Sequence, residues 1–274
     1  MLKTRILTAA IVLPLFLAAL FYSSANFWAV LLLILTMGGS WEWAKLAKFA
    51  VIDSIIYLGF TALLGGGLLM VLGEASRIYP YTTVLLWIYA TSLVFWVGGV
   101  PFLLKSKRPI KNPVLLAFIG WLLLLPACLA LYQLRAISPL LLLGFMMAIW
   151  ISDTAAYFTG RAFGKHKLAP GISPGKTWEG VVGARVAVFI YALAWSFFFG
   201  EKSRIMLLAP LLLGLAVLGI IGDLFESLMK RHAGVKDSGN ILPGHGGILD
   251  RIDALTSTLP VAVLALLVVT MTAP

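Results

Sequence analysis

Residues 113–134 read PVLLAFIGWLLLLPACLALYQL, a run of 22 residues without a charged side chain. A helix needs about 20 consecutive, mostly apolar residues to cross the hydrocarbon core of a bilayer. This stretch meets that requirement. It therefore predicts a transmembrane helix, and the rest of the chain repeats its pattern.

Further stretches of the same hydropathy lie on both sides of residues 113–134. Together they predict nine spans, at 5–22, 26–44, 53–73, 80–103, 113–134, 139–159, 178–199, 205–229 and 254–272. Backbone polar groups in lipid must be satisfied within each segment, so helices are expected, and the alternating strands of a barrel are not seen. Composition agrees, because 61% of the 274 residues are hydrophobic and only 12% are charged. We predict an all-α, polytopic membrane bundle that forms a single domain over residues 1–274.

The 21 lysines and arginines are distributed unevenly between alternate loops. With the N-terminus inside, sixteen lie on the inner side: two near the N-terminus, two at 45–48, and four each at 105–111, 161–176 and 230–251. Four lie on the outer side, at positions 77, 135, 202 and 204, and Arg185 lies within a span. This positive-inside bias predicts a bacterial-type inner membrane protein with a cytoplasmic N-terminus, cytoplasmic loops at 160–180 and 230–250, and an outer C-terminus. It also accounts for the net charge of +10, so nucleic acid is not an expected partner.

Two smaller features have ordinary interpretations. The first span, of about 18 residues, exceeds the usual hydrophobic region of a signal peptide, so a retained helix is expected. The single cysteine, Cys128, lies in an apolar run and is expected to be a small buried residue.

The acidic residues gather near the C-terminus. Five of the eleven lie within residues 223–253, at Asp223, Glu226, Asp237, Asp250 and Asp253. The same stretch carries Lys230, Arg231, His232, Lys236, His245 and Arg251. Carboxylate oxygens suit Mg²⁺, and lysine and arginine suit phosphate oxygens. The mixture therefore indicates a metal ion acting on phosphates.

Asp223 shares one helix face with Ser227 and Lys230, because the three lie at i, i+4 and i+7. It lies about one and a half turns before the predicted end of its span, where a charge facing lipid is costly. Intramembrane carboxylates of this kind usually face a bundle interior or a wet cavity and mark function. The alternative is a structural ion pair between Asp223 and either Lys230 or Arg231.

A glycine-rich loop, PGHGG at residues 243–247, precedes the last span. Such a loop allows close backbone approach, and at a helix N-terminus it offers N–H groups to a phosphate. Asp250 and Asp253 follow at i and i+3 in the first turn. Helix capping would explain one of them more comfortably than both. His245, flanked by glycines, is expected to contact phosphate or fix the loop.

The loop at 160–180 is a second candidate, with SPGKTWEG at residues 173–180. Gly-Lys-Thr suggests a P-loop, but position 170 is proline and the context is helical, so that interpretation is rejected. A basic loop that touches lipid headgroups or nucleotide phosphates remains, although topology explains Lys165 and Lys167 equally well. Asp153, in the preceding span, is a weaker functional candidate.

Residues 227–253, SLMKRHAGVKDSGNILPGHGGILDRID, resemble the signature of the phosphatidate cytidylyltransferases. Residues 173–180 also resemble the loop that precedes the signature in that family. The resemblance implies a multi-helix membrane enzyme that depends on Mg²⁺, is often dimeric, and uses CTP and phosphatidic acid. It further implies that Asp223 and Asp250 hold the metal.

From the residues and the resemblance together we expect catalytic roles for Asp223, Lys230, Arg231, Lys236, Asp237, His245, Asp250, Arg251 and Asp253. Substrate binding is expected of Ser173, Lys176, Lys167, Ser227, Gly246 and Gly247. The lipid phosphate would attack the α-phosphorus of CTP and expel pyrophosphate, and it is already anionic at pH 7, so no strong general base is required. The alternatives are another membrane phosphotransferase acting on a phospholipid or polyprenyl phosphate, and a cation transporter using Asp153, Asp223 and Asp250.

Overall fold

The computed structural model describes residues 2–73, 82–198, 205–241, 243–244 and 246–272. The elements in chain order are α1 (Leu2–Tyr22), α2 (Ala25–Leu46), α3 (Val51–Gly73), α4 (Thr82–Val94), the π-helical turn η1 (Phe95–Gly99), α5 (Val100–Ser106), α6 (Pro113–Ile137), α7 (Pro139–Phe163), β1 (Lys167–Ala169), β2 (Ser173–Thr177), α8 (Trp178–Phe198), α9 (Ile205–Ala233) and α10 (Leu249–Thr272).

Each predicted span is helical over the residues that the structure describes. Eight helices in the described residues are long and apolar enough to cross a membrane, with α4, η1 and α5 joined into one span, Thr83–Ser106. The side chains of α1 are described over Ile6–Tyr22, which is a shorter apolar helix. The prediction of an all-α polytopic bundle is confirmed, and the protein is embedded in a membrane through these helices.

One helix end differs from the prediction in a way that matters for the site. Helix α9 continues to Ala233, four residues past its predicted end. Asp223 therefore lies ten residues, almost three turns, before the end of its helix, and the expected one and a half turns was wrong. The hydropathy criterion ended the span too early because the last turn of α9 is basic.

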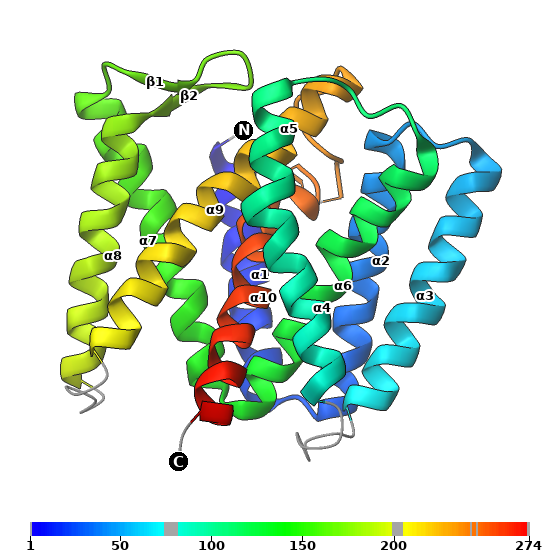
Figure 1. Cartoon of the computed structure of the whole chain (residues 1–274), viewed down its shortest axis with the longest axis horizontal. Helices are drawn as coiled ribbons and strands as arrows, with labels where there is room; N and C mark the ends of the chain where they lie inside the picture. Colours follow the sequence, from blue (N-terminus) through cyan, green and yellow to red (C-terminus); the bar gives the residue numbers. More distant parts are fainter. Residues whose placement is uncertain (1, 74–81, 199–204, 242, 245, 273–274) are drawn as a thin grey trace.

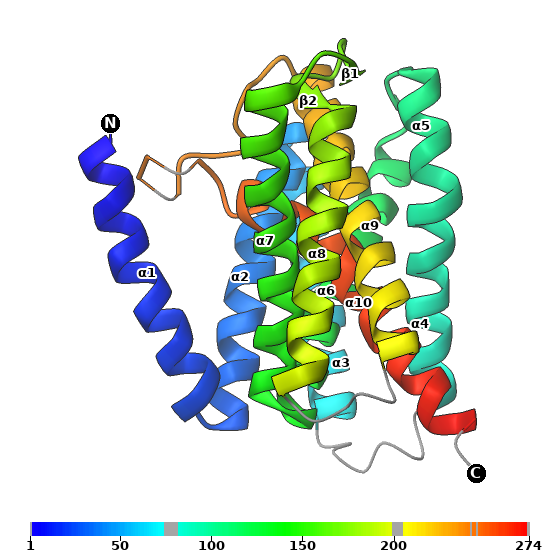
Figure 2. The same cartoon turned by 90° about the vertical axis from the view of Figure 1, so that its left-hand side faces the viewer.

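Helix α10 lies at the centre of the bundle, against α9, α6 and α4 (Figure 1). Its buried side chains include Leu255, Leu259, Ala262 and Val263. Helices α7 and α8 pack closely on each other at one side of the bundle. Figure 2 shows α1 leaning away from the other helices toward its own N-terminus.

One end of the bundle, here called the site end, gathers several polar segments. Figure 1 shows the start of α1, the end of α5, the β1–β2 hairpin and the loop after α9 at this end, with the C-terminus opposite. These are the segments that the charge distribution assigned to a common side of the membrane. The structure therefore agrees with the predicted alternation of the spans.

The β1–β2 hairpin is an element that the sequence did not predict. Lys167 pairs with Thr177 and Ala169 with Ser173 in an antiparallel arrangement. The hairpin runs directly into α8, where the backbone N–H of Trp178 donates to the carbonyl of His166 at 2.9 Å. The segment at 160–180 therefore contains an ordered hairpin, not an irregular loop.

Candidate active site

The site begins with an unusually close approach of α9 to α10. A Cβ added at Gly222 would lie 2.6 Å from the Ser257 hydroxyl and 2.7 Å from the Asp253 carbonyl. At Gly219 it would meet Ala254 at 3.5 Å. Small residues let membrane helices approach in this way. The contact places Asp223, the next residue of α9, beside the first turns of α10.

Helix α9 then ends abruptly. Gly234 has φ of 81°, a left-handed conformation that suits glycine. Its N–H donates to Arg231 O at 3.1 Å, and the N–H of Val235 donates to Lys230 O at 2.9 Å. This paired arrangement is a Schellman motif. It turns the chain sharply at the end of α9, and the described residues that follow include Ser238, which contacts Asp250 at the start of α10.

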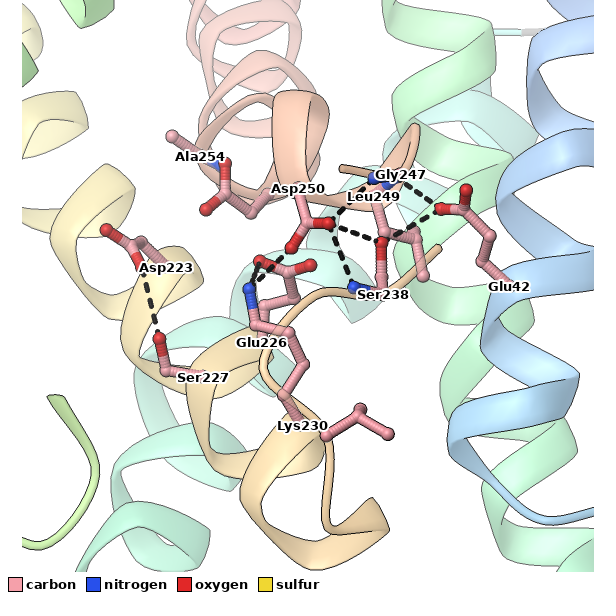
Figure 3. Close-up of polar contacts among 12 residues, drawn as sticks. Glu42, Asp223, Glu226, Ser227, Lys230, Ser238, Gly247, Leu249, Asp250 and Ala254 are labelled. Atoms are coloured by element: carbon pink, nitrogen blue, oxygen red, sulfur yellow. Dashed lines mark hydrogen bonds and ion pairs between the residues drawn. The ribbon is translucent and has the colours of Figure 1, made fainter. Parts of the chain in front are cut away.

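Asp250 is the centre of the contacts at the start of α10 (Figure 3). Its Oδ2 accepts from the Gly247 N–H at 2.8 Å, the Ser238 N–H at 2.9 Å and the Ser238 hydroxyl at 2.9 Å. Its Oδ1 lies 2.6 Å from the ammonium of Lys230. One oxygen of Asp250 therefore holds the loop that precedes α10, and the other faces a lysine.

Lys230 lies between two buried carboxylates. Its Nζ is 2.6 Å from Asp250 and 3.0 Å from Glu226 Oε2, one turn earlier on α9. The exposed fractions of the three side chains are 11% for Lys230, 6% for Asp250 and 7% for Glu226. Charges this deeply buried are stable only when they are paired. The group Glu226–Lys230–Asp250 is called the inner triad below.

Asp223 belongs to a second, more open group. Its Oδ2 lies 2.5 Å from Nζ of Lys176, which β2 carries over α9. Its Oδ1 accepts from the Ser227 hydroxyl at 3.3 Å, which confirms that these two residues share a helix face. The pairing of Asp223 with Lys230 or Arg231, which the sequence left open, is not the one formed.

Two further carboxylates surround that pair. The charges of Asp153 on α7, Asp223 and Asp253 act on one another, and the charge of Lys176 offsets them. Asp253 also accepts from the N–H of Ala254 at 2.8 Å. Asp153, Asp223, Asp253 and Lys176 are called the outer group below. In it, α7, α9 and α10 bring three carboxylates near one another, and Lys176 of β2 offsets part of their charge.

Asp223 and Asp250 do not yet form a metal centre in this arrangement. The described residues contain no group of three or more His, Cys, Asp and Glu side chains placed to hold one ion. Each of the two aspartates is instead paired with its own lysine, at 2.5 Å and 2.6 Å.

Glu42 is a site residue that the sequence analysis missed. It lies on α2, has only 1% of its surface exposed, and accepts from the N–H groups of Ile248 at 3.0 Å and Leu249 at 2.9 Å. It also accepts from the hydroxyl of Ser238 at 3.0 Å. Its separation in sequence, about 200 residues, hides these contacts. The one available signal was a carboxylate in a long apolar span.

Several N–H groups where the glycine-rich loop enters α10 are hydrogen-bonded within the protein. Those of Gly247, Ile248 and Leu249 donate to the carboxylates of Asp250 and Glu42. A Cβ at Gly246 would lie 2.6 Å from Asp250 Oδ2, and one at Gly247 would lie 2.4 Å from Glu42 Oε2. These glycines make room for carboxylates.

The remaining expected site residues lie at the edge of the two groups. Arg231 is exposed and donates to the carbonyls of Ile172 at 3.4 Å and Val235 at 3.2 Å, which ties the hairpin to the end of α9. Four other expected site residues have exposed side chains: Lys167, Lys236, Asp237 and Arg251. Ser173, in β2, is partly buried. His245 lies outside the described residues.

The sequence of the chain is similar to that of known proteins. Residues 3–269 match the sequence profile of the cytidylyltransferase family. The chain is 38% identical over 272 residues to the phosphatidate cytidylyltransferase of Pseudomonas aeruginosa, with 95% of each chain covered. It is 35% identical over 285 residues to that of Haemophilus influenzae, covering 95% of this chain and 96% of the relative. A Staphylococcus haemolyticus phosphatidate cytidylyltransferase is 50% identical over 114 residues, which cover 42% of this chain and 44% of the relative.

The family profile and the first two relatives match nearly the whole chain, and the profile includes α9, the glycine-rich loop and most of α10. They confirm the resemblance that residues 227–253 carry. The protein is therefore a membrane-embedded nucleotidyltransferase that belongs to the cytidylyltransferase family.

Proposed function

We propose that the protein transfers the cytidylyl group of CTP to phosphatidic acid, giving CDP-diacylglycerol and pyrophosphate. The names of the two nearly full-length relatives support this substrate pair. The structural observation that carries the proposal is the pairing of Lys176 with Asp223 and of Lys230 with Asp250. Two cations held against carboxylates, at one end of an apolar bundle, suit a reaction between two phosphate anions.

The reaction forms a bond between a phosphate oxygen of the lipid and the α-phosphorus of CTP. The bond from that phosphorus to the bridging oxygen of the β-phosphate breaks, and pyrophosphate leaves with the electron pair. The lipid phosphate is a monoester with a second pKa near 6, so it is already ionised at pH 7. Alignment and charge neutralisation are therefore the main requirements.

The chain offers two lysines for that task. We assign Lys176 and Lys230 to the phosphate oxygens, because each places its ammonium group at the site. In the present arrangement both are neutralised by aspartates. Binding of the triphosphate would exchange these ion pairs for ammonium–phosphate contacts, which are charge-assisted hydrogen bonds of the strong kind.

The donor atoms at Asp223 and Asp250 fit Mg²⁺, which prefers carboxylate oxygens. Each aspartate already binds one positive charge, the ammonium of a lysine, so a cation is stable at both places. Asp250 would offer Oδ1, because the loop holds Oδ2. The ion would supply further charge neutralisation to the triphosphate. With Asp223 and Asp250 holding the ion, the ammonium groups of Lys176 and Lys230 would be available to the phosphates of the substrates.

The proposal is tested with purified protein in mixed micelles supplied with CTP, phosphatidic acid and Mg²⁺. CDP-diacylglycerol and pyrophosphate are expected in equal amounts, and both should vanish when a chelator removes Mg²⁺. Asp223→Asn keeps the size of the side chain and is expected to lower turnover at least about 100-fold, or about 2.7 kcal/mol. Asp53→Asn, an exposed aspartate in the first turn of α3, is the matched control and should keep wild-type turnover.

The alternatives give distinct outcomes. Product from CTP and a polyprenyl phosphate, with none from phosphatidic acid, would identify another lipid phosphotransferase. Cation uptake into proteoliposomes that depends on Asp153 and Asp223, without nucleotide turnover, would favour a transporter. Either result would overturn the proposed reaction.

Two broader expectations remain proposals. We propose that the site end faces the cytoplasm, where CTP is available, on the basis of the positive-inside distribution. We also propose a homodimer, which the family resemblance implies. Native mass spectrometry of the detergent-solubilised protein would give the oligomeric state, and a monomer under active conditions would contradict it.

A further inference from the structure

We infer that Glu42 is a positioning residue that holds the glycine-rich loop and the start of α10, so that Asp250 and Lys230 are aligned for the reacting phosphates. The role of Lys230 at the phosphates rests on the proposed function. The anchoring of the loop and of α10 rests on the contacts of Glu42 alone. No residue of α2 was expected to act in the reaction.

Glu42 joins a helix from the first part of the chain to the last turn before α10. Both of its oxygens are engaged, Oε1 by the N–H of Ile248, and Oε2 by the N–H of Leu249 and the hydroxyl of Ser238. A helix begins with N–H groups that lack partners within the helix, and it carries a partial positive charge there. The buried carboxylate of Glu42 satisfies both requirements of α10.

The loop is shaped around this carboxylate. A Cβ added at Gly239 would lie 2.4 Å from Glu42 Oε1, and one at Gly247 would lie 2.5 Å from the same oxygen. No Cβ is accommodated at such distances without movement. The glycines on both sides of the loop are therefore required by the position of Glu42.

A single hydroxyl group connects Glu42 to the inner triad (Figure 3). The Ser238 oxygen lies 3.0 Å from Glu42 Oε2 and 2.9 Å from Asp250 Oδ2. A hydroxyl carries one proton, so it serves the two carboxylates by sharing or alternation. The position of Asp250 Oδ2 thus depends on Glu42, and Asp250 Oδ1 in turn holds Lys230 at 2.6 Å.

Helix α2 is a rigid support for this chain of contacts. Trp43, next to Glu42, donates from Nε1 to the Leu116 carbonyl of α6 at 2.8 Å. Its ring stacks on that of Phe225, with centroids 6.3 Å apart. Phe225 directly precedes Glu226 of the inner triad. Glu42 is therefore on a helix that is fixed against α6 and against α9, which carries two residues of the triad.

The test compares Glu42→Gln and Ser238→Ala with Thr36→Val. Glutamine keeps the size of Glu42 but replaces one acceptor oxygen with a donor, so a bond to α10 is lost. Alanine at 238 removes the shared hydroxyl and leaves the contacts of Glu42 with α10. Thr36 is a buried polar residue of the same helix that bonds to its own helix, at Leu32 O, so Thr36→Val is the control.

Both test variants are expected to lower kcat at least about tenfold, with KM for CTP within about threefold of wild type, because misalignment acts on the transition state. Combined, they should lower kcat by much less than the product of the two single effects, because both break one connection. Thr36→Val should match wild type. A kcat within twofold of wild type in folded Ser238→Ala, or fully multiplicative effects, would overturn the inference.

A second measurement does not depend on turnover. Hydrogen exchange at the amides of Ile248 and Leu249 should rise at least about tenfold in Glu42→Gln and stay unchanged in Thr36→Val. Unchanged exchange in Glu42→Gln would refute the anchoring. If the wild type made no CDP-diacylglycerol while exchange rose as expected, the proposed function would fail and the anchoring of α10 by Glu42 would stand.

Discussion

At the scale of single residues, buried charge in this protein is organised by pairing. The inner triad holds one ammonium between two carboxylates, and the three side chains are at most 11% exposed. Removing one partner from such a group leaves an uncompensated buried charge, which costs far more than an exposed ion pair contributes. Lys230 therefore has a structural role that is separable from its proposed role at the phosphates.

Lys230→Met tests the structural role. Loss of the ammonium leaves Glu226 and Asp250 facing each other, and breaking a buried pair costs about 3–5 kcal/mol. The thermal unfolding midpoint in detergent should fall by at least about 5 °C. Lys165→Met, at an exposed lysine of the same end, is the control and should unfold at the wild-type temperature. An unchanged midpoint for Lys230→Met would show that the carboxylates find other partners.

Sequence reasoning at this scale succeeded where the interacting residues are close in the chain. The shared face of Asp223 and Ser227 follows from helical spacing, and the structure confirms it. It failed where the partner comes from another element. The contacts of Glu42 with residues 238–249, and of Lys176 with Asp223, depend on how helices pack, which local periodicity does not encode.

At the scale of elements, hydropathy identifies the helices, whereas glycine positions determine which helices approach one another closely. Spans of 18 or more apolar residues are recognisable without an alignment, so every helix of the bundle was predicted from hydropathy. The β1–β2 hairpin was not, because both strands are short and lack alternation, and β2 contains Ser, Pro and Gly. The contact of Gly222 with α10 was not predicted either, because it depends on which helix packs against α9.

Gly222→Ala and Gly214→Ala form a matched pair on α9. Alanine is intrinsically better than glycine in a helix by about 1 kcal/mol. At Gly214 nothing lies within 4 Å of the added methyl group, so stability should stay the same or rise. At Gly222 the methyl group meets Ser257 and the Asp253 carbonyl, so α9 must move away from α10.

We therefore expect Gly222→Ala to lower the unfolding midpoint and to lower turnover at least about tenfold, since the move displaces Asp223. Gly214→Ala should retain full turnover. Thermal unfolding and pyrophosphate release, measured on the same preparations, decide the matter. Equal behaviour of the two variants would mean that the α9–α10 contact adjusts without cost.

At the scale of the whole molecule, the polar segments lie at one end. The hairpin, the residues after α9 and the end of α5 share this end, while the junction of α6 and α7 lies at the other (Figure 1). The basic residues of the chain follow the same division. A site that takes a nucleotide from water and a lipid from the bilayer requires such an end, facing the compartment that holds the nucleotide.

Cysteine labelling of spheroplasts tests the orientation with two probes. Gly175, in the hairpin, has open space around an added Cβ, and Ile137, at the end of α6, is 49% exposed. The native Cys128 is buried, with 4% exposure, and Cys128→Ser gives a background without it. In that background, Ile137→Cys should react with a membrane-impermeant maleimide on sealed spheroplasts. Gly175→Cys should react only after permeabilisation, because the positive-inside rule places the site end in the cytoplasm.

Each labelling pattern has a distinct meaning. The reverse pattern would place the site end outside, away from cytoplasmic CTP, and would contradict both the orientation and the route proposed for the nucleotide. Labelling of both probes on sealed spheroplasts would contradict an odd number of crossings between positions 137 and 175. In the described chain, α7 is the one helix between these two positions, so the two probes report on a single membrane crossing. Because the helices form one bundle, the direction of α7 also gives the orientation of the other helices in the membrane.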